Sequence, residues 1–201
     1  GQLDHFFDAM YRSGQGLRVI HSRHEQGVAY MAYGYARSTG KVGVYAVVPG
    51  PGLLNSSAAL CTAWGNGAQV LCLSGQIPST AIGKGYGELH EIPDQLGMIR
   101  HITKWAARIE SPAEAPILVR EAMRQLHEGR PRPVELEMAM DIMGQCANVE
   151  LLPPKNEIWA PPVDEDQIKA AARLLGKAKR PLIVVGGGAI HAAAKILAIA
   201  E

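Results

Sequence analysis

Apolar and polar positions alternate along most of the chain in two distinct rhythms. Apolar residues recurring every three or four positions predict helices, and short continuous apolar runs predict strands. The predicted helices are 3–13, 25–38, 51–64, 93–99 and 112–128, and the predicted strands are 17–21, 42–48, 70–74, 104–109 and 133–138. We interpret these strands as apolar runs without polar alternation, which is typical of a parallel sheet covered by helices on both faces. The predicted fold class is therefore α/β.

The pattern changes between residues 140 and 163. Two proline pairs bracket a stretch with weak periodicity, so we predict an interdomain linker over 141–163. After it come a predicted helix at 165–177, a strand at 182–185, three glycines at 186–188 and a helix to the end of the chain. This order predicts that 164–201 begins a Rossmann-like domain. His191 stands where the last glycine of the dinucleotide fingerprint belongs, which weakens a nicotinamide oxidoreductase as an interpretation.

Composition narrows the class of protein. The 201 residues are 47% hydrophobic and 19% charged with a net charge of +1, as in an ordinary globular protein. This balance favours neither nucleic acid nor a membrane as the partner, and no apolar run approaches the roughly 18 residues that span a bilayer. The three cysteines are odd in number and widely spaced, so we expect reduced thiols and a cytoplasmic protein. The seven histidines have no metal-ligand spacing, so no metal site is predicted in this chain.

Glu25 is the first candidate functional residue. It follows the apolar run 17–20 and opens a helix rich in small residues. In open α/β sheets, ligands bind in the crevice where strands end and helices begin. Alternatively, Glu25 only complements the positive end of its helix. The segment alone does not decide between the two.

A second candidate site is the turn Gly50-Pro51-Gly52, followed by Asn55. Pro51 suits the first position of a helix, and the two glycines let another group approach the backbone. Free N–H groups at such a helix start can meet an anion or an acceptor atom. A tight turn without any ligand is an equally good interpretation.

A glycine-rich loop over 75–88 is the third candidate, because long loops at the end of a sheet are often functional. It begins beside Gln76 and leads to His90. His90 could transfer protons near neutral pH, although an isolated histidine in a loop is more often a structural hydrogen-bonding group.

Taken together, these segments resemble the thiamine-diphosphate (ThDP) enzymes of the acetolactate synthase, pyruvate oxidase and 2-oxoacid decarboxylase superfamily. The resemblance covers roughly residues 5–190. It rests on five landmarks in order: His24-Glu25-Gln26-Gly27; Gly50-Pro51-Gly52 with Asn55; Gly75-Gln76-Ile77-Pro78 with Ile82-Gly83; Ile102-Thr103-Lys104; and Gly129-Arg130-Pro131-Arg132-Pro133-Val134.

The resemblance implies three α/β domains, of which this chain would supply the pyrimidine-binding domain (1–140) and the opening of the middle domain (164–201). Both ends of the chain lie in helical patterns, so we expect a fragment of a longer protein in preference to a short independent protein. The resemblance implies that about one strand–helix unit is missing before Gly1. In the family the middle domain binds FAD or an ADP-containing group. The third domain holds the diphosphate through Mg²⁺ with a Gly-Asp-Gly motif, which this sequence lacks. The fragment alone should therefore be inactive.

The family also implies roles for individual residues. Glu25 would hydrogen-bond N1′ of the aminopyrimidine and so promote loss of the thiazolium C2 proton. The turn Gly50-Pro51-Gly52 and Asn55 would approach the pyrimidine ring. Gln76 would lie near the active-site entrance. His90 aligns, allowing two extra loop residues, with a glutamine of acetolactate synthases and is a candidate proton relay.

The resulting function is decarboxylation of a small 2-oxoacid and transfer of its acyl carbanion, as in acetolactate synthase. Val48-Pro49 and Ser79 depart from the Thr-Ser and arginine that acetolactate synthases often have. A ThDP-dependent decarboxylase or lyase for an aromatic or CoA-linked acid therefore stays open, as does a non-catalytic nucleotide-binding module of the same fold. Small residues at Ala29, Ala32 and Ala36 suit either intrachain packing or the interface of a homodimer or homotetramer.

Overall fold

The computed structural model of the chain describes residues 1–153 and 162–201. It divides the chain into two units, Gly1–Ala160 and Pro161–Glu201, which are described separately below. The domain types predicted for these units from the sequence stay predictions.

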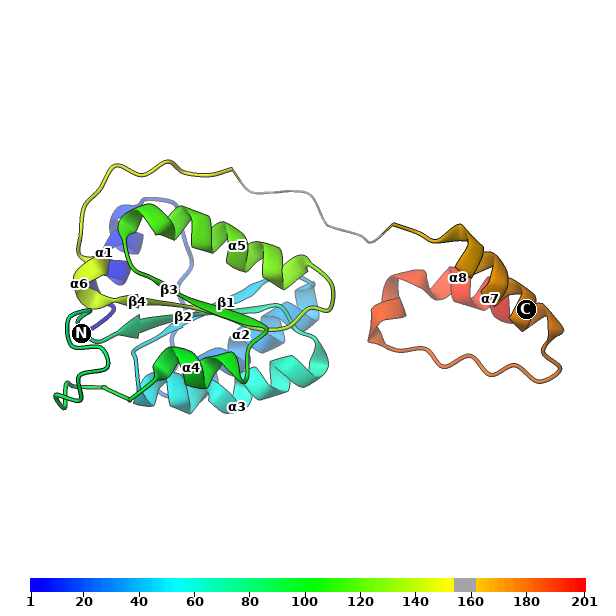
Figure 1. Cartoon of the computed structure of the whole chain (residues 1–201), viewed down its shortest axis with the longest axis horizontal. Coiled ribbons are helices and arrows are strands. Elements are labelled where there is room, and N and C mark those ends of the chain that lie inside the picture. The colour runs from blue at the N-terminus through cyan, green and yellow to red at the C-terminus, as the bar shows by residue number, and fades with distance from the viewer. Residues whose placement is uncertain (154–161) are drawn as a thin grey trace. The chain divides into compact units, whose positions relative to one another are not determined.

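The first unit is built on a four-stranded parallel sheet (Figure 1). The strands are β1 (Gly43–Val47), β2 (Val70–Gln76), β3 (Trp105–Ile109) and β4 (Val134–Ala139), in the order β1-β2-β4-β3. The register places Ser74 opposite Glu137 and Glu137 opposite Arg108, so these three residues form one row across adjacent strands. The predicted α/β fold with a parallel sheet is confirmed.

Helices cover both faces of this sheet, as Figure 1 shows. On one face lie α2 (Glu25–Thr39), α3 (Pro51–Asn66) and α4 (Gln95–Arg100), and on the other α1 (Asp4–Arg12), α5 (Ala115–His127) and α6 (Met140–Met143). A single 3₁₀ turn, η1 (Pro112–Glu114), leads into α5. Each face buries its own apolar cluster, one around Leu53 and Leu60 and the other around Leu126 and Leu136. This packing holds the starts of α2 and α3 in place.

Small residues let α2 pack closely on β1. Ala29, Ala32 and Ala36 are buried along α2. A Cβ atom at Gly43 would lie only 2.0 Å from the backbone oxygen of Ala32, so only glycine fits there. The alanine spacing seen in the sequence thus serves packing within the chain.

Two predicted strands are wrong. Residues 17–21 and 182–185 form no strand, and Leu17, Val19 and Ile20 are 54–61% exposed. Leu182 and Val184 are each 86% exposed. An apolar run becomes a strand only when a neighbouring strand satisfies its backbone N–H and C=O groups, and neither run pairs with any strand in the described residues.

The expectation that the strands lack polar residues is also wrong for β4. Glu135 and Glu137 alternate with apolar residues there, and both are 0% exposed. They are tolerated in a strand buried on both faces because side chains of β2, β3 and α4 hydrogen-bond them.

The second unit contains α7 (Glu165–Lys177), a 3₁₀ segment η2 (Gly187–Ala192) and α8 (Ala193–Ala200). The predicted helix 165–177 is confirmed to the residue, because the Asp164 side chain accepts hydrogen bonds from Asp166 N and Gln167 N at its start. The predicted linker 141–163 falls partly on 154–161, which lie outside the described residues, and α6 occupies its beginning. Within the described ranges, no helix combines the length and apolar character needed to cross a membrane.

Candidate functional site

Glu25 is the first residue of α2. The preceding His24 has extended backbone angles, and its Nδ1 accepts a hydrogen bond of 3.1 Å from Gln26 N. This cap starts the helix at Glu25 and places the carboxylate near free N–H groups. A Cβ at Gly27 would lie 2.5 Å from Ser22 Oγ, so the glycine lets the incoming chain pass close to the first turn.

Asn55 meets Glu25 from the start of α3. Gly50 caps α3 with a φ of 55°, and Pro51 occupies its first position. Asn55 Nδ2 donates a 3.0 Å hydrogen bond to Glu25 Oε2. Two sequence landmarks 30 residues apart are thereby joined into one site.

The local field keeps Glu25 ionised. A hydrogen bond from its own backbone N–H lowers its pKa most, and the hydrogen bond from Asn55 lowers it further. The nearby charges of His24 and His90 act in the same direction. Glu25 is only half-buried, so the site presents an accessible carboxylate that is charged at neutral pH.

The glycines of the turn are required by close approach. A Cβ at Gly50 would lie 2.3 Å from the backbone oxygen of His90. A Cβ at Gly52 would lie 2.6 Å from Val48 Cγ2 and 3.8 Å from Glu25 Cγ. Because these glycines have no side chain, the backbone at His90 can lie against the turn, and space is left beside the Glu25 carboxylate.

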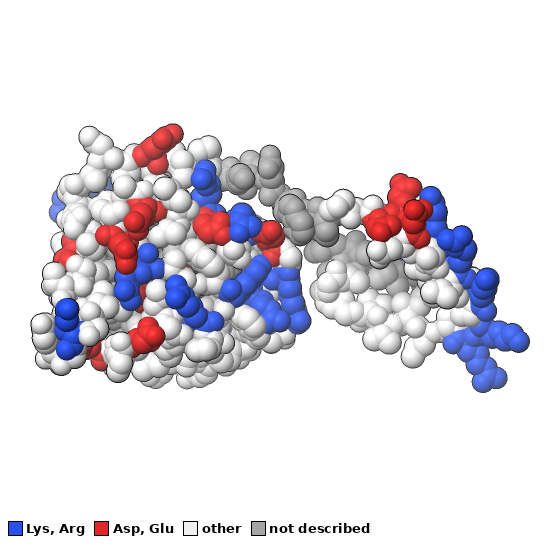
Figure 2. All heavy atoms as spheres, in the orientation of Figure 1, with Lys and Arg blue, Asp and Glu red and all other residues white. Residues whose placement is uncertain are grey.

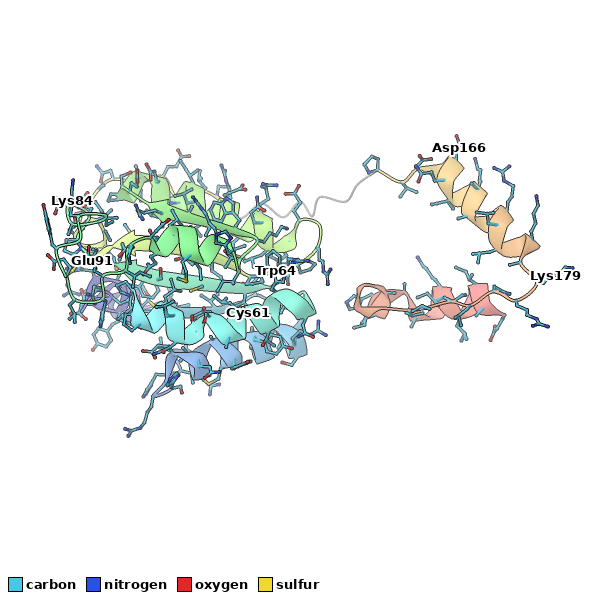
Figure 3. All side chains as sticks on the ribbon, turned by 60° about the horizontal axis from the view of Figure 1, so that its bottom comes forward. Cys61, Trp64, Lys84, Glu91, Asp166 and Lys179 are labelled. Atoms are coloured by element: carbon cyan, nitrogen blue, oxygen red, sulfur yellow. The ribbon has the colours of Figure 1, made fainter. Side chains whose placement is uncertain are left out.

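His90 lies beside the turn in a strained conformation, with a φ of 72°. Its Nδ1 lies 3.1 Å from Gln2 Oε1, and Gln2 Nε2 donates to Leu89 O at 3.0 Å. Glu91 orders the preceding loop by accepting hydrogen bonds from the backbone N–H groups of Gly85, Gly87 and Glu88. Figure 3 shows Lys84 and Glu91 on this loop at one end of the first unit, with Trp64 of α3 toward the other.

Gln76 lies in a different place from the Glu25–Asn55 pair. It is 4% exposed, its Oε1 accepts from Ile77 N at 2.8 Å, and its Nε2 lies 3.4 Å from Glu137 Oε2. Its predicted role near the active-site entrance stays a prediction.

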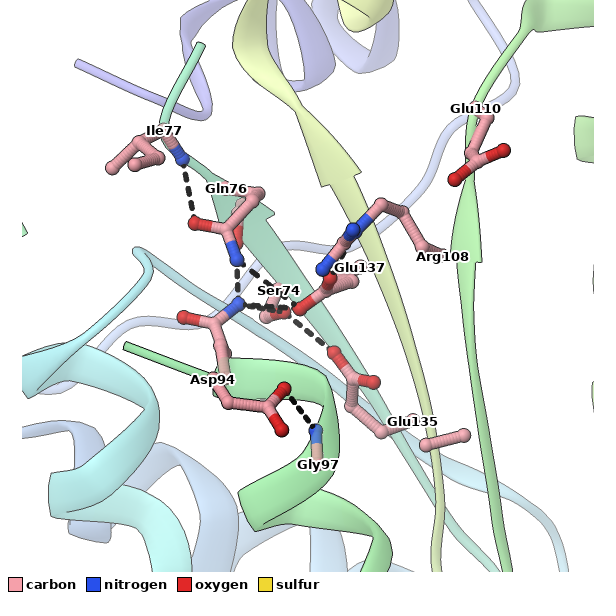
Figure 4. Close-up of polar contacts among 12 residues, drawn as sticks. Ser74, Gln76, Ile77, Asp94, Gly97, Arg108, Glu110, Glu135 and Glu137 are labelled. Atoms are coloured by element: carbon pink, nitrogen blue, oxygen red, sulfur yellow. Dashed lines mark hydrogen bonds and ion pairs between the residues drawn. The ribbon is translucent and has the colours of Figure 1, made fainter. Parts of the chain in front are cut away.

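Sequence reasoning missed the buried polar cluster around Gln76 (Figure 4). Its further members are Ser74, Gln95, Arg108, Glu135 and Glu137. The available signal was the alternation of two glutamates with apolar residues in a strand predicted to be buried. Charged residues are almost never fully buried unless they are paired, so this alternation indicated partners elsewhere in the fold.

No group of three or more metal-ligating side chains occurs in the described residues. On the face shown in Figure 2, acidic and basic side chains are interspersed over the first unit. The site brings together one ionised carboxylate, its amide partner and the backbone of a glycine turn.

The chain is similar to a known protein family and to curated proteins. Residues 1–98 match the family described as thiamine pyrophosphate enzyme, N-terminal TPP binding domain. The chain is 36% identical over 203 residues to a probable 2-ketoarginine decarboxylase from Pseudomonas aeruginosa, which covers 96% of this chain and 35% of that protein. It is 36% identical to the acetolactate synthase large subunit of Buchnera aphidicola, covering 94% of this chain and 34% of that protein.

A glyoxylate carboligase from Escherichia coli is 33% identical, over 97% of this chain and 32% of its own length. The chain thus spans about a third of the length of the curated relatives it matches.

Proposed function

We propose, because residues 1–98 match the N-terminal TPP binding domain of thiamine pyrophosphate enzymes and ThDP-dependent relatives match nearly the whole chain, that Glu25 binds the aminopyrimidine ring of ThDP. The observation that carries this proposal is the accessible Glu25 carboxylate, fixed by Asn55 at 3.0 Å where two helices begin. In the complete enzyme this site would serve decarboxylation of a 2-oxoacid and transfer of the acyl group.

The residues present fit the ring. An aminopyrimidine offers a ring nitrogen that can carry a proton, and an ionised carboxylate is the acceptor that favours it. Gly52 leaves the space beside Glu25 unfilled, since a Cβ there would reach to 3.8 Å from Glu25 Cγ. Pro51 is exposed at the same helix start and would contact the ring face.

ThDP, when bound, supplies an acidic thiazolium carbon and an electron sink for the decarboxylation. Glu25 would accept the hydrogen bond from N1′–H and stabilise the protonated ring nitrogen. Asn55 would hold Glu25 Oε2 in place, so that the carboxylate needs no reorganisation. His90, whose charge already reaches Glu25, would relay protons at the edge of the site.

Acetolactate synthesis is the first candidate reaction, because acetolactate synthases are among the relatives that match nearly the whole chain. Decarboxylation without carboligation is the second candidate, favoured by 36% identity to a probable 2-ketoarginine decarboxylase. Ser79 supports the second candidate. It replaces the arginine frequent in acetolactate synthases, and its N–H and hydroxyl are both committed to Asp141, at 2.8 and 2.6 Å.

A non-catalytic nucleotide-binding module is the weaker interpretation, because such a module has no need of an ionised acid at this position. We further propose that Mg²⁺ is held by a domain absent from this chain, that the middle domain beginning at 164–201 holds FAD or an ADP-containing group, and that the enzyme is cytoplasmic. This chain by itself should bind ThDP weakly.

Assembly into a homodimer or homotetramer is supported by an exposed apolar face on α2. Tyr30, Met31 and Tyr35 are 38%, 43% and 48% exposed there. A second copy of the chain would cover these side chains, although Ala29, Ala32 and Ala36 already pack within the chain.

The test uses the complete enzyme with ThDP and Mg²⁺. Pyruvate, glyoxylate and 2-ketoarginine are supplied one at a time, and products are identified by mass spectrometry. Acetolactate from pyruvate supports the first candidate, and an aldehyde one carbon shorter than the supplied 2-oxoacid supports the second. Undiminished turnover in Glu25→Gln would contradict the role of Glu25 whichever product forms.

A further inference from the structure

A buried polar cluster lies directly behind the Gly50 turn. Five of its side chains are 0–4% exposed and come from β2, β4 and the first residue of α4: Ser74, Gln76, Gln95, Glu135 and Glu137. Two carboxyl groups therefore share one water-excluded space (Figure 4). Such groups persist only when their partners are well placed.

The two carboxyl groups have unequal partners. Glu137 Oε1 pairs with Arg108 Nε at 2.5 Å, and Glu137 Oε2 accepts from Gln95 Nε2 at 2.8 Å. Glu135 Oε1 accepts from Ser74 Oγ at 2.5 Å, whereas its Oε2 has no hydrogen-bond partner in the described part of the chain. Burial and the charge of Glu137 raise the pKa of Glu135 well above its ordinary value. Glu137, which pairs with Arg108, is thus the charged partner that Gln95 meets.

Gln95 has only one orientation that suits this cluster. Its Nε2 faces three acceptors, namely Glu137 Oε2, Gly75 O at 3.0 Å and Ser74 Oγ at 3.3 Å. Its Oε1 accepts a 2.8 Å hydrogen bond from Gly50 N. A flipped amide would place its oxygen against a carboxylate and its NH₂ against an N–H donor. The Glu137 charge therefore fixes which end of Gln95 meets the turn.

Gly50 is the point where this contact reaches the functional site. Its backbone has a φ of 55° and lies against the His90 carbonyl, so it has little freedom to move. It caps α3, and Asn55 lies in the next turn of that helix, bound to Glu25. Displacement of Gly50 would displace the start of α3 and with it the Asn55 amide.

We propose that Gln95 is a positioning residue for the Glu25–Asn55 site, because its side-chain amide ties the Gly50 N–H to the buried Glu137 carboxylate. The expected effect on turnover rests on the proposed function. The link from Glu137 through Gln95 to Gly50 is present in this chain without cofactor and can be measured by itself.

The first measurement follows amide hydrogen exchange at Gly50 by NMR, without ThDP, in wild type and in Gln95→Met. Methionine keeps the volume but removes both hydrogen-bonding ends. We expect Gly50 exchange to accelerate about tenfold or more, since a buried donor loses the Gln95 acceptor. Gln69→Met is the matched control, because Gln69 Nε2 also donates to a backbone oxygen, Leu126 O at 3.1 Å, but at the amino end of β2. It should leave Gly50 exchange unchanged.

The second measurement uses Gln95→Glu, which is nearly isosteric. While protonated, the new side chain can donate to Glu137 and accept from Gly50 N. Once ionised, it faces Glu137 and is repelled. Among the described residues, the cations whose charge acts on the cluster are Arg108 and Arg100. Asp94, the preceding residue, adds no positive charge, because it is an acid whose carboxylate accepts from Gly97 N at 2.8 Å. The ratio of variant to wild-type Gly50 exchange should therefore rise with pH.

Turnover of the complete enzyme should follow this ratio. We expect kcat of Gln95→Glu to fall about 10-fold to 100-fold relative to wild type from pH 6 to pH 8, with a smaller change in KM for ThDP, because misplaced catalytic groups cost that much. A merely structural role would lower kcat only in proportion to the folded fraction measured by circular dichroism, without this pH trend.

Unchanged Gly50 exchange in Gln95→Met would overturn the inference, as would a variant-to-wild-type ratio independent of pH in Gln95→Glu. Should Gln95→Met fail to fold, Gln95→Glu decides alone. A failure of the proposed function is distinguishable from these outcomes. If Glu25 does not bind the pyrimidine, Glu25→Gln keeps full turnover, while the change in Gly50 exchange in the Gln95 variants is still observed.

Discussion

Two carboxylates in this chain are each held by a side-chain amide, yet their surroundings give them opposite tasks. Asn55 donates to Glu25 at 3.0 Å where α2 and α3 begin, and Gln95 donates to Glu137 at 2.8 Å inside the sheet's carboxyl edge. Glu25 is half-buried and can meet a ligand, whereas Glu137 is fully buried. The same pair of groups is thus open to a ligand in one place and closed to it in the other, and burial makes the difference.

The largest expected effect is on turnover at the accessible pair. Glu25→Gln removes the ionised acceptor and should lower kcat of the complete enzyme by about 10²–10⁴-fold, the usual contribution of a placed proton-transfer group. The thermal midpoint should stay within a few degrees, because Glu25 is not part of either apolar cluster. Glu150→Gln, at an exposed acid, is the control and should retain full turnover. Equal kcat values for Glu25→Gln and Glu150→Gln would show that the accessible Glu25–Asn55 pair has no part in turnover.

The buried pair should show its effect in stability. Glu137→Leu leaves Arg108 and Gln95 without their carboxylate, and breaking a buried pair in this way costs about 3–5 kcal/mol. Urea unfolding monitored by circular dichroism measures the loss, with Glu25→Leu as the accessible counterpart. If Glu137→Leu lowered the free energy of unfolding by less than about 1 kcal/mol, the range of exposed pairs, burial would not distinguish the Glu137 pair from the Glu25 pair.

A smaller effect is expected in the pH dependence of stability. Burial and the charge of Glu137 raise the pKa of Glu135, so the folded protein keeps a proton that the unfolded chain releases. Stability therefore falls as pH rises from the ordinary glutamate pKa toward the raised one. Glu135→Gln removes this fall, and its Tm relative to wild type should rise by about 2–4 °C between pH 5 and pH 8. A constant difference across this range would contradict a protonated Glu135.

The smallest effect concerns Asn55. Its hydrogen bond is the second cause that lowers the pKa of Glu25. A lowered carboxyl pKa gives stabilisation that is present above the ordinary value and lost as pH falls through the lowered one. Asn55→Ala should therefore shift the acidic limb of the pH–rate profile to higher pH and lower kcat by roughly threefold to tenfold. If the acidic limb did not move, the lowered pKa of Glu25 would come from the backbone at the start of α2 and not from Asn55.

Much of the fold was predictable because its signals are local. Asp164 caps the helix that follows it, and His24 does the same for α2. Gly50 and Pro51 mark the start of α3. These helix caps and the proline act on residues three or four positions away at most, so they can be recognised in the sequence without knowledge of the fold.

The failures share a physical cause. Residues 17–21 and 182–185 are as apolar as a strand but have no neighbouring strand in the described residues, and pairing is not a property of a segment alone. The alternation of Glu135 and Glu137 was visible, but its meaning depended on Ser74, 61 positions away, and on Gln95, 42 positions away.

The order of motifs along the chain was enough to indicate an α/β fold, the candidate acid Glu25 and its neighbour Asn55, because backbone conformation and capping are set by adjacent residues. The contact between Glu25 and Asn55, the burial of Gln76 and the hydrogen bond from Gly50 to Gln95 required the folded chain. Hydrogen bonds between distant segments form only after the sheet and its helices have packed, and that packing places Gln95 where it connects the buried carboxylate to the turn beside Glu25.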